Sequence, residues 1–407
     1  MEFDKRGGYR EVEHLKSLVN SDNIEGYFDK IIKLNLLSDL CRQFFKNFSN
    51  TARFDKMSNS EVYDFFDYQL NTISINTAKD MKVEDVWFDD NFVSELNKGE
   101  AVGLSYGKAC PRLNYLTLSV PLGDLTMLGG FSGTGKTSFV FENMILTMAE
   151  SGIKCCIISN EMQVRAYKQL LAVHILTKDL DYWKITRKHL KTGNFTDEQN
   201  EMLRKAAKIS QEKYKNIKFV KMFDNDTTRV VKTIRKYSKL GFQMFLWDTM
   251  KSDDDVSMEM YRQLLVASRK VFQAASRENV AVVCTYQLAL YLLNQRYLDA
   301  NCLSNGKQIK EVFSEMIYIR PLWEDEYTGE RYDCKAYTRG KNADGTWEKF
   351  TTPITLDKTK KYIVAFLDKT RNDEDKQQIL YEVNFTWNNW REVGFCTIRN
   401  EHVQTTR

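Results

Sequence analysis

Hydrophobic positions recur at helical spacing in the first part of the chain. Apolar residues lie three and four positions apart across residues 27–45, and a second run of this kind covers residues 62–73 after a polar break. This spacing places the apolar side chains on one face of each helix, so we expect two helices joined as a hairpin. A hairpin of this size buries little apolar surface alone, so it should pack on the main domain or on further copies of itself.

A shorter amphipathic pattern follows at residues 83–96, where apolar and acidic residues alternate at helical spacing. Glycine-containing stretches at residues 98–100 and 103–107 flank this predicted helix and are typical of flexible joints. The apolar face of such a helix can dock on a neighbouring subunit or on its own domain, and the pattern favours neither.

From residue 116 the pattern changes to apolar runs that alternate with helical segments. The runs lie at residues 125–128, 155–158, 242–247 and 280–284, and residues 363–367 and 379–385 are expected to pair around a charged turn. This alternation indicates an α/β fold with a mainly parallel sheet. We therefore divide the chain into a helical hairpin domain (1–77), a linker with the amphipathic helix (78–110) and an α/β domain (111–407).

The composition is that of an ordinary globular protein and excludes few classes of function. Apolar residues make up 43% and charged residues 28% of the 407 positions, which is ordinary for a globular protein. No apolar run approaches the roughly 18 residues of a membrane span. The eight cysteines show no metal-ligand spacing and there are only four histidines, so we expect reduced thiols in a cytosolic compartment and no zinc site. A net charge of +4 neither requires nor excludes nucleic acid.

Candidate chemistry begins with the motif G-x-x-x-x-G-K-T at residues 130–137. Glycines at these positions let successive backbone N–H groups point at phosphate oxygens, and the following helix directs its positive end at the same place. Lys136 is expected to reach the β- and γ-phosphates of ATP, and the Thr137 hydroxyl to ligate Mg²⁺. The residues predicted to hold the nucleotide are Gly130, Ser132, Gly133, Thr134, Gly135, Lys136, Thr137, Ser138 and Asp248.

Three polar residues follow predicted strands, at the sheet edge where open α/β folds bind ligands. Asp248 ends a buried run and is predicted to complete the Mg²⁺ site, although an acid in a surface turn would give the same pattern. Glu161 is predicted to orient or deprotonate the attacking water, and the alternative is an acid that stabilises the start of a helix. Gln287 is predicted to sense the γ-phosphate, and the alternative is a polar strand end.

The order of these motifs resembles the RecA-like motor of the DnaB family of replicative helicases. Residues 159–162 read Ser-Asn-Glu-Met where the family commonly has Ser-Leu-Glu-Met, residues 248–250 read Asp-Thr-Met for Asp-Tyr-Leu, and residues 286–288 read Tyr-Gln-Leu for Ser-Gln-Leu. Residues 369–372, Lys-Thr-Arg-Asn, match the family's Lys-x-Arg-Asn hairpin. The resemblance covers residues 112–393 best and identifies the chain as a divergent member with a shortened N-terminal domain, which would suit a phage.

This resemblance implies ATP hydrolysis between the subunits of a ring. One subunit would supply Lys136, Glu161 and Gln287, and the next would supply Lys369 and Arg371. It further implies a homo-hexamer with the N-terminal hairpin as a collar, which moves on single-stranded DNA and unwinds forked duplex in the cytoplasm of a bacterial or phage-infected cell. A helicase loader or a primase is the implied partner, and no membrane is involved.

Nucleic acid would be held by loops, among which residues 288–310 are the first candidate, through Arg296, Lys307, Gln308 and Lys310. Residues 321–361 form an insertion relative to the family. Its basic and aromatic residues suit either phosphate contacts with base stacking or a solvated hairpin. A RecA-like ATPase that does not unwind DNA, such as a recombination accessory, a loader or a signalling module, remains the alternative function.

Overall fold

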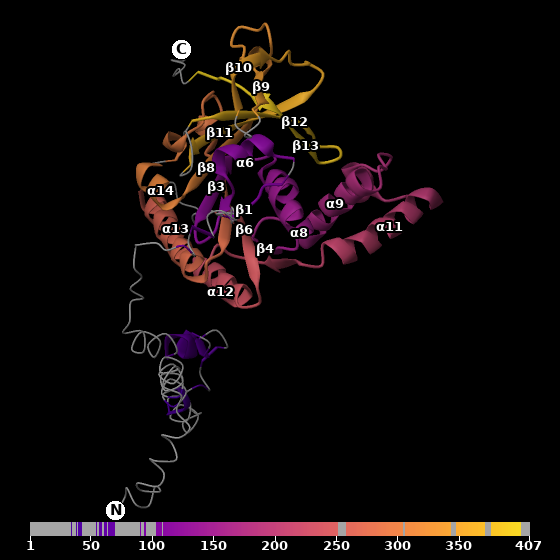
Figure 1. Cartoon of the computed structure of the whole chain (residues 1–407). Helices are drawn as coiled ribbons and strands as arrows, with labels where there is room; N and C mark the ends of the chain where they lie inside the picture. Colours follow the sequence, from indigo (N-terminus) through magenta and orange to yellow (C-terminus); the bar gives the residue numbers. More distant parts are fainter. Residues whose placement is uncertain are drawn as a thin grey trace, which may run out of the picture. The chain divides into compact units, whose positions relative to one another are not determined.

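The computed structural model describes residues 103–107, 109–250, 258–303, 306–342, 347–370 and 376–399, with isolated positions between 34 and 94. The chain separates into two units, Met1–Lys98 and Gly99–Arg407, so the predicted linker (78–110) is divided between them. Figure 1 shows the whole chain. Within the described part, every helix is too short or too polar to span a membrane.

In the first unit, the described positions of the expected helices are helical, and they include residues 40–42, 61–62, 64–69 and 93–94. The second of these helices begins with a reciprocal cap. The backbone N–H of Ser58 donates to Glu61 Oε2 at 2.7 Å, and the N–H of Glu61 donates to Ser58 Oγ at 3.4 Å. The rings of Phe54, Phe65 and Phe66 pack together with centroids 5.4–5.5 Å apart.

The second unit is built on one sheet of eleven strands, in the order β10-β9-β13-β12-β11-β8-β3-β7-β6-β4-β5. Six of these strands are mutually parallel, which confirms the predicted fold class. They are β3 (Leu125–Gly130), β4 (Lys154–Ser159), β5 (Ile217–Lys221), β6 (Phe242–Met250), β7 (Ala281–Gln287) and β8 (Glu315–Pro321).

The remaining strands of this sheet continue it in antiparallel fashion from β8. They are β11 (Lys361–Lys369), β12 (Gln378–Asn384), β13 (Asn389–Phe395), β9 (Tyr337–Lys341) and β10 (Trp347–Pro353). The predicted pairing of residues 363–367 with residues 379–385 is confirmed, because β11 and β12 are neighbours. A separate two-stranded sheet joins β1 (Gly103–Leu104) to β2 (Val120–Pro121).

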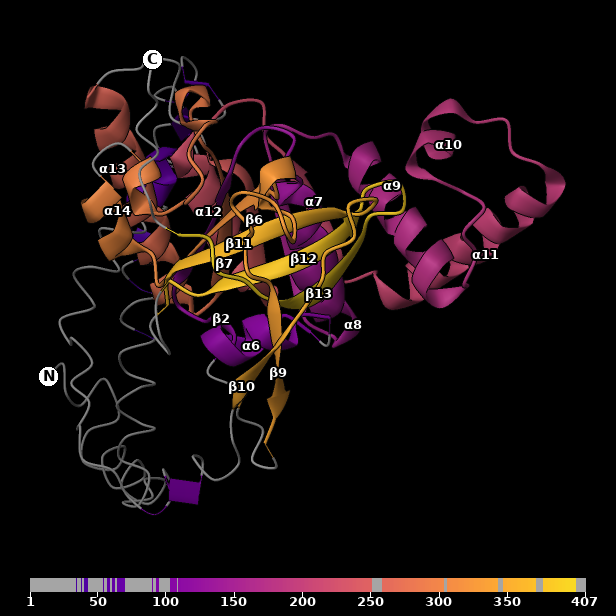
Figure 2. The same ribbon diagram turned by 90° about the horizontal axis from the view of Figure 1, so that it is seen from above.

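Helices cover both faces of the parallel strands, as Figure 2 shows. The described helices of this unit are α6 (Pro111–Thr117), α7 (Lys136–Val140), η3 (Phe141–Leu146), α8 (Thr147–Glu150), α9 (Val164–His174), η4 (Ile175–Asp179), α10 (Arg187–Thr192), α11 (Asp197–Lys213), α12 (Thr227–Ser238), α13 (Met258–Glu278) and α14 (Gly306–Val312). Of these, α10 and α11 project away from the sheet (Figure 2). Short 3₁₀ turns lie at η5 (Leu290–Leu292), η6 (Ala300–Cys302) and η7 (Glu324–Glu326).

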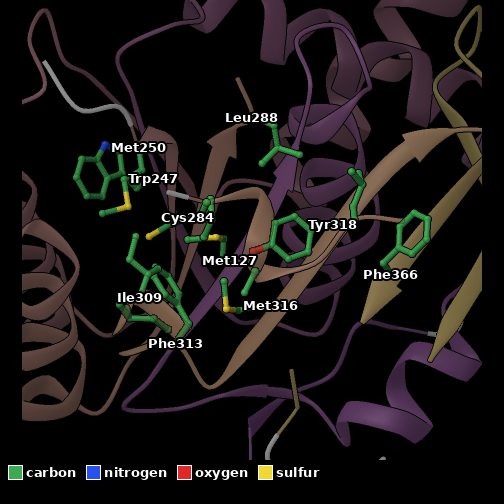
Figure 3. Close-up of a cluster of buried hydrophobic side chains, with 14 of the residues drawn as sticks. Met127, Trp247, Met250, Cys284, Leu288, Ile309, Phe313, Met316, Tyr318 and Phe366 are labelled. Carbon is green, nitrogen blue, oxygen red and sulfur yellow. The ribbon is translucent and has the colours of Figure 1, made fainter. Parts of the chain in front are cut away.

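Four of the parallel strands, β3, β4, β6 and β7, are largely apolar because side chains on both of their faces are buried. In β3, Met127 packs in the core that contains residues of α12, α13 and α14, whereas Leu128 packs in the core that contains residues of α6, α7 and α8. Figure 3 shows the first of these cores, with Met127, Cys284 and Met316 from three neighbouring strands beside Ile309 and Phe313. Two buried faces explain why these strands read as continuous apolar runs.

The insertion at residues 321–361 holds η7 and the β9–β10 hairpin. In the hairpin, Gly340, Glu348, Phe350, Thr351 and Thr352 are exposed, and Phe350 is 87% exposed. β9 joins the sheet only through the pairing of Tyr337 with Phe395. The described part of this hairpin is therefore mostly open to solvent, as the solvated alternative expects.

Glu315 is a buried carboxyl group at the start of β8, with its residue 1% exposed. Tyr106 Oη and Thr126 Oγ1 donate hydrogen bonds to its Oε2 at 2.7 and 3.1 Å, while Oε1 is buried without a partner. Burial raises the pKa of Glu315 to about 8, although the two hydrogen bonds act in the opposite direction. The folded chain therefore holds a proton here at pH 7.

We predict that Glu315→Gln makes the free energy of unfolding fall less steeply with pH between 5 and 9. Without the substitution, the unfolded chain loses this proton above about pH 4.5, whereas the folded chain keeps it up to about pH 8. The contribution of Glu315 to the free energy of unfolding is therefore full below about pH 4.5 and is lost as the pH rises through about 8. At about 1.4 kcal/mol per pKa unit, this loss is roughly 4 kcal/mol by pH 9. Denaturant unfolding across this range measures it. Glu311→Gln, at an exposed position, should leave the slope unchanged, and an equal slope in Glu315→Gln would contradict the assignment.

Candidate nucleotide site

The predicted phosphate loop lies between β3 and α7, with Gly130 ending the strand and Lys136 beginning the helix. Gly133 and Gly135 have φ of +77° and +92°, a region that residues with a Cβ rarely adopt. A Cβ at Gly135 would also approach the Phe385 ring to 2.8 Å, whereas one at Gly133 would meet no atom within 4 Å. Gly135 is therefore packed against the rest of the protein, whereas there is space for a ligand beside Gly133.

Lys136 is buried with its ammonium group inside the loop. Its Nζ donates to the carbonyl oxygens of Gly130 and Phe131 at 2.9 and 2.8 Å, and the residue is 9% exposed. Thr134 Oγ1 also donates to the carbonyl of Phe131, at 2.9 Å. The positive charge of Lys136 and the N–H groups at the start of α7 meet at this point, which is the electrostatic requirement for binding an anion.

Asp248 is the centre of the polar contacts in the site. It lies near the carboxyl end of β6 and is 1% exposed. Thr137 Oγ1 lies 3.0 Å from both of its carboxylate oxygens, Tyr167 Oη donates to Oδ2 at 2.6 Å, and Thr285 Oγ1 donates to Oδ1 at 2.7 Å. The structure thus brings together Thr137 and Asp248, the two predicted metal ligands, although they are 111 residues apart in the chain.

Tyr167 and Thr285 were missed by the sequence analysis. Burial and the charge of Asp248 raise the pKa of Tyr167 well above its usual range, so Tyr167 stays protonated and donates to the carboxylate. The sequence offered a clue for Thr285, because it lies two residues before Gln287 on the same predicted strand. No local pattern marks Tyr167, because it belongs to the apolar face of α9.

Glu161 follows β4 and is exposed, beside the buried Asp248. Thr249 connects the two acids, because its Oγ1 donates to Glu161 Oε2 at 2.9 Å and lies 3.2 Å from Asp248 Oδ1. Asn160 fixes the backbone here, since its side chain donates to the Thr249 carbonyl and accepts from the Thr249 N–H. Glu161 is therefore an exposed acid at the same edge of the sheet as the phosphate loop.

The other predicted nucleotide residues lie close to the loop in different ways. Gln287 is half-buried and lies opposite Gly130 in the β3–β7 pairing. Ser132 is exposed on the loop. Ser138 faces inward instead, where its Oγ accepts from Trp390 Nε1 at 2.9 Å and donates to Asn388 Oδ1.

Lys369, one of the two residues predicted to act from a neighbouring subunit, lies at the carboxyl end of β11. Lys369 is the last residue of that strand, and its Nζ donates to the carbonyl oxygens of Phe313 (2.7 Å) and Lys310. Arg371 lies outside the described residues.

The residues predicted to bind DNA are not equivalent. Arg296 is engaged internally, because its guanidinium pairs with Asp325 and Glu326 and lies 3.9 Å from the centre of the Tyr332 ring. Its side chain is only 12% exposed, so we leave it out of the proposed interface. Lys307, Gln308 and Lys310 lie on α14, where Gln308 is exposed and Lys310 pairs with Asp368 at 3.2 Å.

Within the described residues, no group of three or more His, Cys, Asp or Glu side chains could hold a metal ion by itself. The donor set that is present, one hydroxyl and one carboxylate at a phosphate loop, fits Mg²⁺ that is bound together with nucleotide phosphates. Thr137 and Asp248 would hold the ion.

Comparison with known proteins supports the same fold. Two of the solved structures that align with the chain cover most of it. One is described as an ATPase domain, at 14% identity and a TM-score of 0.58, over 76% of this chain and 100% of that one. The other is "The Structure Of A DnaB-Like Replicative Helicase And Its Interactions With Primase", at 12% identity and a TM-score of 0.62, over 96% of this chain and 84% of that one. At these identities, the alignments show a shared RecA-like fold.

No curated protein matches the chain in sequence. Residues 108–297 match the family described as DnaB-like helicase C terminal domain, and this range includes the phosphate loop, Glu161, Asp248 and Gln287 but ends before Lys369. Over this range, the chain is similar to the DnaB-like helicase family.

Proposed function

We propose that the chain is an ATP-dependent replicative DNA helicase. It forms a ring, hydrolyses ATP at subunit interfaces, moves along single-stranded DNA and unwinds forked duplex. The observation that carries this proposal is the cluster of Lys136, Thr137 and Asp248 at one edge of a RecA-like sheet, within a range similar to the DnaB-like helicase family.

The nucleotide would lie on the loop at residues 130–137, with its phosphates at Lys136 and the start of α7. When bound, Mg²⁺ neutralises charge on the phosphate oxygens. Tyr167 and Thr285 hold the Asp248 carboxylate in one orientation, so that the metal site is positioned before the nucleotide arrives. Glu161 orients or deprotonates the water, and Gln287 responds to the γ-phosphate.

We predict that Glu161→Gln binds ATP normally but hydrolyses it at least ~100-fold more slowly. The amide keeps the shape of the side chain and its contact with Thr249 but cannot accept a proton from water. Steady-state turnover and equilibrium binding of a fluorescent ATP analogue measure the two effects. Glu201→Gln, which removes an exposed carboxylate on α11, should leave turnover unchanged. Normal turnover in Glu161→Gln would place the water-orienting role elsewhere.

Neighbouring subunits complete the site in this proposal. Lys369 and Arg371 of one subunit act on the ATP of the next, and residues 1–77 form a collar joined by the linker at residues 78–110. A hexamer is the proposed assembly, and Lys307, Gln308 and Lys310 are the proposed DNA contacts. A helicase loader or a primase is the proposed partner of the N-terminal part.

The decisive experiment measures ATP turnover with and without single-stranded DNA, at low and moderate salt, on protein sized by light scattering with nucleotide. A ring-sized species whose turnover rises with DNA supports the helicase and justifies an unwinding assay on a forked duplex. Phosphate contacts should make DNA binding weaken steeply with salt. Turnover that ignores DNA, on a monomer or dimer, would favour the alternative of a RecA-like ATPase that does not unwind DNA.

A further inference from the structure

The carboxyl end of β11 is tied to α14 and η6 by a compact set of polar contacts. Lys369 Nζ donates to the carbonyl oxygens of Lys310 and Phe313, and Lys310 Nζ donates to the carbonyl of Asp368 at 3.0 Å. The Asp368 carboxylate accepts from the Ala300 N–H at 3.1 Å and pairs with Lys310 Nζ at 3.2 Å. We call these residues (Ala300, Lys310, Phe313, Asp368 and Lys369) the β11–α14 contact.

The β11–α14 contact satisfies groups that α14 cannot satisfy alone. The last carbonyl groups of a helix lack intrahelical partners and carry partial negative charge, so a cation is favoured beside them. Lys369 supplies that cation. The Asp368 side chain is 4% exposed, and its burial raises its pKa, which the nearby charge of Lys310 opposes. The Lys310 side chain is 31% exposed, so losing the charge of Asp368 weakens this contact and leaves the Lys310 ammonium partly solvated.

α14 is also held from its apolar side. Figure 3 shows Ile309 and Phe313 beside Met316 and Met127 in the core of the sheet. The helix is therefore clamped between the apolar core and the end of β11. If α14 shifts, the carbonyl groups that hold the Lys369 ammonium shift with it.

The Lys369 ammonium cannot contact the end of α14 and the nucleotide of an adjacent subunit at the same time. While the ammonium donates to the carbonyl oxygens of Lys310 and Phe313, it is held within its own subunit. The proposed DNA contacts Lys307 and Gln308 lie on the same helix, less than one turn before Lys310. A ligand that moves α14 will thus change the position from which Lys369 acts.

We propose that the β11–α14 contact is a switch that restrains Lys369 until single-stranded DNA binds at α14. DNA that draws α14 away releases the ammonium group, which then becomes available to the nucleotide of the adjacent subunit. Asp368 is a positioning residue in this scheme, because it touches α14 and η6 and not the nucleotide. This inference rests on the proposed function, and it assigns to Asp368 the coupling between DNA binding and hydrolysis.

The test is Asp368→Asn in the full chain, with ATP turnover measured with and without single-stranded DNA. The amide can still accept from the Ala300 N–H but loses the charge that holds Lys310. We expect DNA-free turnover to rise about fivefold, the effect of one weakened hydrogen bond, and DNA-stimulated turnover to stay near that of the unaltered chain. The stimulation ratio therefore falls, whereas a merely structural defect would lower both rates.

Asp299→Asn is the matched control. It removes the same charge from the residue before Ala300, the N-cap of η6, where the side chain accepts from the N–H and side-chain amide of Asn301. Its stimulation ratio should equal that of the unaltered chain. A ratio in Asp368→Asn equal to that of this control would overturn the inference.

Two further measurements keep the outcomes distinct. If the unaltered chain shows no stimulation by DNA, the proposed function and the switch are both overturned, whereas equal ratios in the two variants overturn the switch alone. If Asp368→Asn does not fold, Lys310→Gln weakens the same ion pair from the other side, and its DNA affinity is measured separately. A rise in its DNA-free turnover supports the switch, and a fall in both rates opposes it.

Discussion

Lys136→Ala abolishes ATP hydrolysis and leaves a folded protein: this is the first of the two largest effects that we expect. The Lys136 ammonium is buried in the phosphate loop, held by the carbonyl oxygens of Gly130 and Phe131. A preorganised charge in a water-excluded site stabilises the charge that develops in phosphoryl transfer, so its loss should cost at least ~10³ in turnover.

Two measurements separate this effect from misfolding. Thermal unfolding should show a cooperative transition, because Lys136 contributes a charge and little apolar area. Lys205→Ala, on the exposed side of α11, is the matched control and should keep full turnover. Unchanged hydrolysis in Lys136→Ala would show that residues 130–137 do not form the site of hydrolysis.

Arg371→Ala should also abolish turnover while nucleotide binding stays near normal. In the proposal, the subunit that binds ATP is different from the subunit that supplies Arg371, so binding and hydrolysis separate. An arginine supplied from a neighbour is worth about 10³–10⁵ in rate in related phosphoryl-transfer enzymes. Arg391→Ala, an exposed arginine paired with Glu382 on β12, is the control and should behave as the unaltered chain.

Mixed rings give the sharper test of this arrangement. When Arg371→Ala and Lys136→Ala subunits are combined, some interfaces receive an intact Lys136 from one subunit and an intact Arg371 from the next. Turnover should therefore reappear and pass through a maximum with the mixing ratio. No recovery at any ratio, once mixed rings are demonstrated by energy transfer between labelled subunits, would show that the site is not shared.

The sequence alone was enough for the phosphate loop and most of the parallel sheet. The loop is a run of eight consecutive residues (130–137), and its conformation depends on glycines within that run. The strands at β3, β4, β6 and β7 could be predicted because burial on both faces makes each one a continuous apolar run. The position of Asp248 followed from the end of such a run.

Strands with weaker patterns were missed. β8 begins with Glu315 and ends with Arg320 and Pro321, so its sequence lacks the appearance of a central strand. It nevertheless lies between β3 and β11, because Tyr106 and Thr126 accommodate the acid and Glu326 pairs with the arginine. Tyr106 and Thr126 are distant from β8 in sequence, so the residues around β8 do not reveal that its acid can be buried.

What the sequence determined by itself is local: a glycine-rich loop between a strand and a helix, acids at strand ends and helices between the strands of a sheet. Only the tertiary structure decided which side chains share a partner. Tyr167 and Thr285 meet at Asp248, Arg296 is withdrawn into an ion-pair cluster, and Lys369 is bound to α14. The physical reason is that backbone conformation follows neighbouring residues, whereas a polar side chain is placed by whichever charges and carbonyl groups the fold brings within about 3 Å.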